Sequence, residues 1–231
     1  MADESFGEAI RILNSLQSNA TARKSAASAD ASWRRAKFDL TVETLVQLGY
    51  PPSHLNKLNI IHIAGSKGKG STAAMTASIL SRFLGSRAPS KIGVFTSPHL
   101  RTVRERIRLI SGPVTDGSAC LISEQQFAAY FFDVWRRLER QHAAGALAEL
   151  PTFFKCLFAV AVHAFVREGV DTAIVECGIG GEYDATNVLD RPVVSAITTL
   201  ELEHTDLLGR TLTSVAWHKA GILRAGVPAL T

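Results

Sequence analysis

A run of glycine and lysine at residues 65–71 has the composition of a phosphate-binding loop. A tight glycine turn lets backbone N–H groups converge on phosphate oxygens, and a lysine adds a mobile positive charge. The run departs from the general pattern G-x-x-x-x-G-K-[ST], because Ile63 stands at the first glycine position and Gly70 follows Lys69. A basic surface turn is the alternative. The apolar run before it and the helix-like segment after it favour a nucleotide loop made of Gly65, Ser66, Lys67, Gly68, Lys69, Gly70 and Ser71.

Three further apolar runs end in residues that can bind ligands. Core packing alone does not require hydroxyls, carboxylates or histidines at these points. The residues are Ser97, Pro98 and His99 after the second run, Glu176 with Gly178, Gly180 and Gly181 after the third, and Glu201, Glu203 and His204 after the fourth. In parallel sheets, ligands bind beyond the carboxyl ends of the strands. We therefore predict one site that gathers these residues around the phosphate loop.

Short apolar runs alternate with longer helix-like segments along the chain. Strands are predicted for residues 58–64, 91–96, 105–110, 170–176, 192–200 and 226–231. Helices are predicted for residues 5–18, 31–49, 71–84, 123–141, 151–169 and 212–223. Ser123 and Gln126 have the spacing of a capping box at the start of one of them. This alternation predicts an α/β fold with a doubly wound, mainly parallel sheet that carries a phosphate loop.

The bulk composition suits a folded protein that binds small anions. The chain has 231 residues, of which 46% are hydrophobic, and a net charge of +4, so a nucleic-acid partner is not required. There is no apolar run of about 18 residues and no typical leader, which predicts no membrane span. Cys120, Cys156 and Cys177 form no C-x-x-C pair, so reduced thiols are expected. A cytoplasmic monomer is predicted, and a mitochondrial form or association stays open.

Four stretches of the sequence resemble known motifs. GSKGKGS resembles the compact G-T-x-G-K-[GT]-[ST] loop of the Mur ligase superfamily. FTSPHLRTVRERIRL, VECGIGGEYDATN and HTDLLGRTLTSVAWHKAGI resemble, in the same order, motifs of the folylpolyglutamate synthase family within it. AIRILNSLQSNA near the start looks like the eukaryotic form. The resemblance runs from about residue 5 to residue 231 and implies a sheet of the Mur ligase central-domain type.

The resemblance implies an ATP-dependent ligase. Such an enzyme adds L-glutamate to the γ-carboxyl of tetrahydrofolate or its polyglutamates, through an acyl phosphate made with ATP. The implied catalytic residues are Lys69, Glu176, His204 and Lys219, and the implied Mg²⁺ ligands are Ser97, Glu176 and His204. Lys219 matches a lysine that is carbamylated in this superfamily. A solvated lysine on an amphipathic helix is the alternative for that position.

The resemblance also implies where folate binds. The implied substrate-binding residues are Ser97, Pro98, His99, Arg104 and Arg106. An arginine there could pair with a substrate carboxylate. The alternative is that Arg104, Arg106 and Arg108 alternate along one exposed strand face. We further expect Asp184 and Asn187 to brace the glycine turn at 178–181 or to reach the ligand. Trp33, Trp135 and Trp217 are expected to be packing residues.

The sequence departs from the family pattern at several positions. Ser66 replaces the usual threonine and keeps a hydroxyl. Glu201 replaces a glycine and could disturb a tight approach to nucleotide, and Glu203 replaces an aspartate. PTFFK differs from P-x-Y-F-R, and Cys177 stands where valine is common. We interpret Cys177 as a small apolar substitute and not as a nucleophile.

Family members continue well beyond the length of this chain. We therefore expect a helical lead-in over residues 1–57, a truncated phosphate-loop α/β core over 58–231, and no C-terminal glutamate-binding domain. A fragment of this kind is expected to bind nucleotide weakly and to be inactive alone. Two alternatives stay open, namely a dihydrofolate synthase or other Mur-type amino-acid ligase, and a non-catalytic nucleotide-binding remnant. A P-loop kinase is disfavoured by the order of Glu176, His204 and Lys219.

Overall fold

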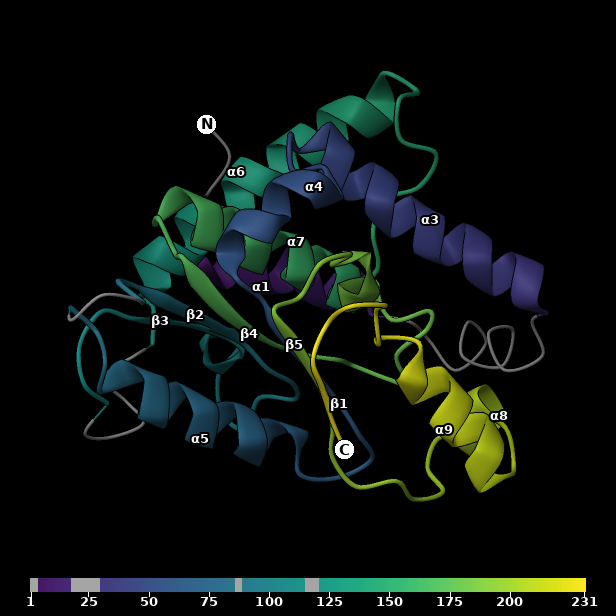
Figure 1. Cartoon of the computed structure of the whole chain (residues 1–231). Coiled ribbons are helices and arrows are strands. Elements are labelled where there is room, and N and C mark those ends of the chain that lie inside the picture. Colours follow the sequence, from purple (N-terminus) through teal and green to yellow (C-terminus); the bar gives the residue numbers. More distant parts are fainter. Residues whose placement is uncertain (1–3, 18–29, 86–88, 115–120) are drawn as a thin grey trace.

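The computed structural model describes residues 4–17, 30–85, 89–114 and 121–231 (Figure 1). Its helices are α1 (Phe6–Ser15), α3 (Ala31–Gln47), α4 (Pro52–Leu55), α5 (Lys69–Ser81), α6 (Glu124–Ala143), α7 (Phe153–Arg167), α8 (Thr205–Leu208) and α9 (Leu212–Ala220). Its strands are β1 (Ile61–Ala64), β2 (Ile92–Phe95), β3 (Ile107–Ile110), β4 (Thr172–Glu176), β5 (Val194–Ile197) and β6 (Ala229–Leu230). Short 3-10 turns cover Asn56–Leu58, Val103–Arg106 and Ala185–Val188.

The strands form one sheet in the order β3-β2-β4-β1-β5-β6. All neighbours in it run parallel except β3, which is antiparallel to β2. The central strand β1 lies between β4 and β5, so that Ile61 faces Ile174 on one side and Val194 on the other. The predicted mainly parallel sheet is confirmed.

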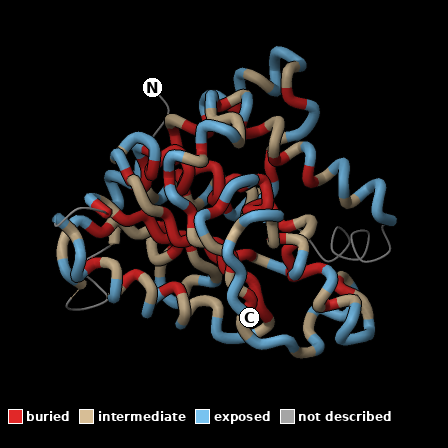
Figure 2. The backbone as a smooth tube through the Cα atoms, in the orientation of Figure 1, coloured by how far each residue is buried: buried red, intermediate tan, exposed pale blue. Residues whose placement is uncertain are grey.

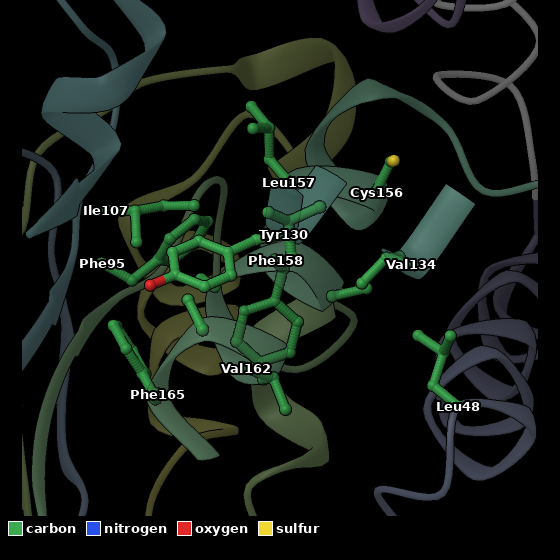
Figure 3. Packing of buried hydrophobic residues seen from close by; sticks show 14 of the residues in the cluster. Leu48, Phe95, Ile107, Tyr130, Val134, Cys156, Leu157, Phe158, Val162 and Phe165 are labelled. Carbon is green, nitrogen blue, oxygen red and sulfur yellow. The ribbon is translucent and has the colours of Figure 1, made fainter. Parts of the chain in front are cut away.

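Helices cover both faces of the sheet, which makes it doubly wound (Figure 1). One face carries the larger hydrophobic cluster, which joins residues of α1, α3, α6 and α7 to β2 and β4. Within it the rings of Phe95 and Phe158 lie 5.5 Å apart (Figure 3). The other face packs Ala73 and Ala77 of α5 against Ile63 and its neighbours. Buried residues fill the centre of the molecule, and exposed residues line its edges (Figure 2).

The expected lead-in contributes to the same core. Ala9 and Leu13 of α1 and Phe38 and Leu45 of α3 belong to the larger cluster together with α6 and α7. The spacing of apolar residues explains the placement of α1, which buries Ala9 and Leu13. Helix α3 buries Thr41 and Thr44 together with Phe38 and Leu45, so its buried stripe is not set by apolar spacing alone.

Most observed elements are shorter than the predicted ranges, and two boundaries near the site also shift. Helix α5 begins at Lys69, two residues before the predicted residue 71, and Gly68 with φ = 85° directly precedes it. Residues 105–106 belong to a 3-10 turn before β3, with a capping box between Thr102 and Glu105. The capping box that was predicted for Ser123 and Gln126 is confirmed at the start of α6.

Candidate functional site

The phosphate-like loop joins the carboxyl end of β1 to α5. Gly65 has φ = 144°, and a Cβ on it would lie 1.8 Å from Thr198 Oγ1. That hydroxyl donates to the Lys67 carbonyl at 2.7 Å, which fixes the turn from the neighbouring β5 side. Lys69 Nζ donates to the Gly65 carbonyl at 2.7 Å, so the ammonium lies against the loop. The loop therefore has the glycine turn, lysine and helix start that a phosphate site requires.

The segment after β5 is joined to the loop. Ser66 N donates to the Thr199 carbonyl at 2.7 Å, and Ser66 Oγ donates to the Glu201 carbonyl at 2.9 Å. Glu201 also pairs with Lys67 at 2.5 Å. The acid that replaces a glycine here therefore lies beside the loop as the partner of a lysine. Its carboxylate neutralises one of the two cations of the loop.

Glu176 ends β4 and points toward the same loop. It is 3% exposed, and its Oε2 accepts a hydrogen bond from Ser97 N at 3.0 Å. A Cβ on Gly70 would lie 3.7 Å from that oxygen, so the carboxyl faces the first turn of α5. Burial raises the pKa of Glu176, while the bond from Ser97 and the charge of Lys69 lower it in part. A bound cation would remove the cost that burial imposes on this carboxylate.

His204 lies on the segment that follows Glu201. It precedes α8 with φ = 44° and has an exposed side chain. Within the described ranges, no hydrogen bond or ion pair joins His204 to Glu176 or Ser97, and no three His, Cys, Asp or Glu side chains cluster as a metal site. The structure therefore brings together Ser97 and Glu176, while His204 makes no hydrogen bond or ion pair with either of them in the described part of the chain. Mg²⁺ prefers hard oxygen ligands and keeps several of its waters, and the side-chain oxygens of Ser97 and Glu176 meet this preference.

Lys219 of α9 is a buried cation. Its side chain is fully buried, and its Nζ lies 2.5 Å from Glu203 Oε1. The alternative of a solvated lysine is therefore wrong. The longer side chain of Glu203, in place of an aspartate, reaches this ammonium from the segment that also carries His204.

A cavity of about 640 Å³ opens beside Ser97. Its walls come from α3, the 97–106 segment, the start of α7, the 178–185 turn and the α8–α9 region. Flat rings from Trp33, Phe153, Phe154 and Tyr183 and the imidazole of His218 line it. Its cations are Arg34, Lys37, Arg106 and Lys155, and its single carboxylate is Asp184. The cavity therefore suits a flat ligand that carries negative charge.

The predicted substrate residues divide into two groups. Ser97, Pro98 and Arg106 line the cavity, and His99 Nδ1 accepts a hydrogen bond from Arg106 Nε at 2.9 Å. Arg104 does not line the cavity and its Nη1 donates to the Ile122 carbonyl at 2.9 Å, so its part in substrate binding stays a prediction. The alternative of one exposed arginine strand face is wrong. Arg106 is 9% exposed and lies in a 3-10 turn before β3.

Several residues of the site were not predicted. Trp33 was expected to pack, but it is 39% exposed and lines the cavity with Arg34 and Lys37. Thr198 and Lys155 were also missed. Helix periodicity shows which residues share one face of a helix, but it does not show which other part of the chain that face contacts. The sequence therefore contained no direct indication that Trp33, Thr198 or Lys155 lies in the site.

The expected bracing of the glycine turn is confirmed for Asp184, which accepts hydrogen bonds from Gly178 N at 2.9 Å and from Ile179 N at 3.0 Å. Asn187 Nδ2 instead donates to the carbonyls of Glu182 and Gly221, both at 3.0 Å, outside the turn at 178–181. Cys177 is buried, and burial raises its pKa, as expected for a packing residue. Cys156 is buried likewise, and Cys120 lies outside the described residues.

Lys155 gives the cavity a titratable group. Burial, and after it the charge of Lys37, lower its pKa from 10.5 to about 8. The unfolded chain therefore holds more protons than the folded chain between about pH 8 and 10.5, so folding stability should rise with pH there. We expect wild type to gain about 1–2 kcal/mol relative to Lys155→Met between pH 8 and 10, measured by chemical denaturation. The control is Lys57→Met, which changes an exposed lysine and keeps Lys155, so it should show the same gain as wild type. No gain in wild type, or a Lys57→Met chain that behaves like Lys155→Met, would contradict the assignment.

The comparisons with known proteins agree with this geometry. The chain is 51% identical over 191 residues to a folylpolyglutamate synthase of Neurospora crassa, covering 81% of this chain and 35% of that protein. It is 47% identical over 238 residues to a probable folylpolyglutamate synthase of Schizosaccharomyces pombe, covering 99% of this chain and 44% of that protein. A solved FPGS–AMPPCP–folate complex superposes with a TM-score of 0.71 at 31% identity, covering 98% of this chain and 49% of that one.

A scan against models of known protein families found no match. None of the helices in the described part of the chain has the length and apolar character that a membrane crossing needs. The chain spans less than half the length of the curated relatives that it matches. The identity to those relatives, the agreement of fold and the phosphate loop beside Glu176 together show that this chain belongs to the folylpolyglutamate synthase family of the Mur ligase superfamily.

Proposed function

We propose that this chain forms the ATP- and folate-binding part of a folylpolyglutamate synthase. The observation that carries the proposal is the meeting of three groups at one edge of the sheet. The phosphate loop, Glu176 and Ser97 lie together there, and Ser97 also lines the cavity. A phosphate donor and a carboxylate acceptor could thus bind side by side.

The nucleotide would bind at the loop and at the start of α5. Backbone N–H groups of residues 67–70 would contact its phosphates, and Lys69 would turn from the Gly65 carbonyl to the outer phosphates. Glu176 and Ser97 would hold Mg²⁺, and His204 is the further ligand that the family resemblance suggests. The ion, when bound, neutralises charge that develops on the transferred phosphoryl group. Support for the nucleotide comes from the relative that was solved with AMPPCP, an ATP analogue.

Folate would bind in the cavity. The rings of Phe153, Tyr183 and Trp33 offer flat apolar contact for a pterin. Arg106, whose guanidinium lies 5.4 Å from the Phe153 ring centre, is a partner for a substrate carboxylate. The γ-carboxyl would then point past Ser97 to the phosphate loop. The same solved relative contains folate, which supports this class of ligand.

The full ligation also needs L-glutamate. We propose that the ligase reaction belongs to a protein of the relatives' length, of which this chain matches 44% in the Schizosaccharomyces pombe relative. Glutamate would be bound by the part of those relatives that this chain does not match. On this basis, the 231-residue chain alone should not elongate tetrahydrofolate.

We also propose Lys219 as the site of carbamylation. The ammonium is held by Glu203 at 2.5 Å, so CO₂ can add only after Lys219 loses its proton and this ion pair opens. Intact mass after incubation with bicarbonate should show the addition of one CO₂ in wild type and none in Lys219→Met. An unchanged wild-type mass would sink this part of the proposal.

Binding of MgATP by the chain tests the main proposal. We expect titration calorimetry to detect binding in wild type and to show it weakened about 10- to 100-fold in Lys69→Ala, because a charge-assisted contact to phosphate is lost. Lys57→Ala changes an exposed lysine that precedes β1 and should bind like wild type. Equal affinity in wild type and Lys69→Ala would refute the nucleotide role of the loop.

Tetrahydrofolate binding is the second measurement. We expect a change of Trp33 fluorescence on addition of tetrahydrofolate, since this side chain lines the cavity. Trp33→Phe should lose the change and retain binding by calorimetry. Binding of dihydropteroate in preference to tetrahydrofolate would instead favour a dihydrofolate synthase.

A further inference from the structure

A line of buried hydrogen bonds runs from the central strand to the wall of the cavity. His62 lies in β1 and is fully buried, and its Nε2 is 2.8 Å from Thr186 Oγ1. Thr186 is also fully buried, and its Oγ1 is 2.6 Å from Asp184 Oδ1. Asp184 Oδ2 accepts from the backbone N–H groups of Gly178 and Ile179. Side chains from β1 and from the turn after β4 are thus joined through three polar groups.

The hydrogens in this line have one consistent direction. Asp184 takes N–H donors from Gly178, Ile179 and Thr186 and one O–H donor from Thr186, which satisfies an ionised carboxylate. The Thr186 hydroxyl has a single hydrogen and two acceptors in reach, and Asp184 Oδ1 at 2.6 Å is nearer and stronger than Cys177 Sγ at 3.4 Å, so Asp184 takes the hydrogen. Thr186 Oγ1 must therefore accept from His62 Nε2, which carries the ring hydrogen.

The other ring nitrogen of His62 supports the same assignment. His62 Nδ1 is buried without a hydrogen-bond partner among the described residues. A bare nitrogen lone pair there costs less than a buried N–H donor with nothing to accept it. Burial lowers the pKa of His62 to about 3, which keeps the ring neutral. Cys177 Sγ lies 3.2 Å from Nε2 and fills the space beside this bond.

We propose that His62 and Thr186 are positioning residues that set the cavity wall relative to the phosphate loop. They act through Asp184 on the N–H groups of Gly178 and Ile179, two residues that line the cavity. The phosphate loop begins at Gly65, directly after β1, the strand that carries His62. The single strand β1 therefore fixes the position of the cavity wall relative to the phosphate loop. For the identity of the cavity ligand, this inference rests on the proposed function.

The glycine turn at 178–181 is packed closely against its neighbours. A Cβ on Gly178 would lie 2.7 Å from the Phe154 ring, and one on Gly180 would lie 2.8 Å from Leu208 Cδ2. A Cβ on Gly181 would lie 2.5 Å from the His218 carbonyl. Such close packing means that a small shift of the turn changes the cavity itself.

The first experiment tests the line of bonds without any ligand. Nitrogen-15 NMR of the wild-type chain should show His62 as the neutral Nε2–H tautomer from pH 5 to pH 8. An Nδ1–H tautomer or a protonated ring would overturn the proposal. This measurement does not depend on ATP or folate binding, so it separates failure of the inference from failure of the proposed function.

The second experiment compares Thr186→Val with Thr186→Ser. Valine keeps the shape and removes the hydroxyl, and serine keeps the hydroxyl. We expect Thr186→Val to weaken tetrahydrofolate binding about tenfold, with MgATP affinity nearly unchanged, and Thr186→Ser to bind both like wild type. Equal losses for both ligands in Thr186→Val would indicate a merely structural role and overturn the proposal.

Amide exchange provides a local readout. In Thr186→Val the amides of Gly178 and Ile179 should exchange at least about tenfold faster than in wild type, while those of β2 stay unchanged. Thr186→Ser should keep the slow exchange. Unchanged exchange at both amides in Thr186→Val would overturn the positioning role. If Thr186→Val does not fold, wild-type NMR and the exchange of Thr186→Ser decide the matter.

Discussion

Replacing Gly65 with alanine should weaken MgATP binding by this chain severely. The added Cβ would lie 1.8 Å from Thr198 Oγ1 and 2.9 Å from Thr198 Cβ, so one of the two backbones must move. The φ of 144° at Gly65 is also unfavourable for alanine. Since the Thr198 hydroxyl holds the Lys67 carbonyl, the displacement would open the turn whose N–H groups face phosphate. We expect a loss of affinity of at least about tenfold and a stability loss of about 1–3 kcal/mol.

Gly49→Ala is the matched control for this substitution. Gly49 also has a positive φ, of 83°, but a Cβ there meets no atom within 4 Å. It should show a modest stability loss and normal MgATP affinity in the same calorimetric titration. If Gly65→Ala bound MgATP as well as Gly49→Ala, the close approach between the loop and Thr198 would have no part in nucleotide binding.

Replacing Glu203 with alanine should cost the chain about 3 kcal/mol of folding stability. The partner of Glu203 is the fully buried ammonium of Lys219, 2.5 Å away. Removing one member of such a pair leaves an uncompensated charge in the interior. Chemical denaturation of Glu203→Ala and wild type at neutral pH measures the difference.

Two further variants serve as controls for the expected stability loss of Glu203→Ala. Glu201→Ala breaks an ion pair of the same 2.5 Å length, but Lys67 is 74% and Glu201 42% exposed, so stability should not change measurably. Adding Lys219→Met to Glu203→Ala should restore most of the lost stability, because an apolar side chain then fills the site. A Glu203→Ala variant as stable as Glu201→Ala would mean that Lys219 is not held as a buried cation.

The sheet and the phosphate loop could be predicted because their determinants are local. Four-residue apolar runs such as Ile61–Ala64 need burial on both faces, and glycines between a strand and a helix leave few other conformations. Glu176 was found for the same reason, since a carboxylate at the end of a buried strand has no packing role. Each of these features is determined by residues that are neighbours in the sequence.

The cavity could not be predicted in this way. Its walls come from five separate parts of the chain, and α3 contributes Trp33, Arg34 and Lys37 from a segment that was expected only to lead into the core. The direction of the Arg104 side chain is a related case. Alternation with Arg106 suggested a shared face, but the 3-10 turn directs Arg104 to the Ile122 carbonyl. Which side chains meet across the molecule depends on tertiary packing that periodicity does not record.

The pairing of β1 has a consequence for biosynthesis. Its two neighbours, β4 and β5, lie in the second half of the chain, so the central strand emerges from the ribosome long before either partner exists. Such distant pairing slows folding and leaves an apolar strand unpaired during translation. A nascent chain would therefore depend on chaperones until Ile197 has been synthesised, and slow codons before β4 should increase its aggregation in cells.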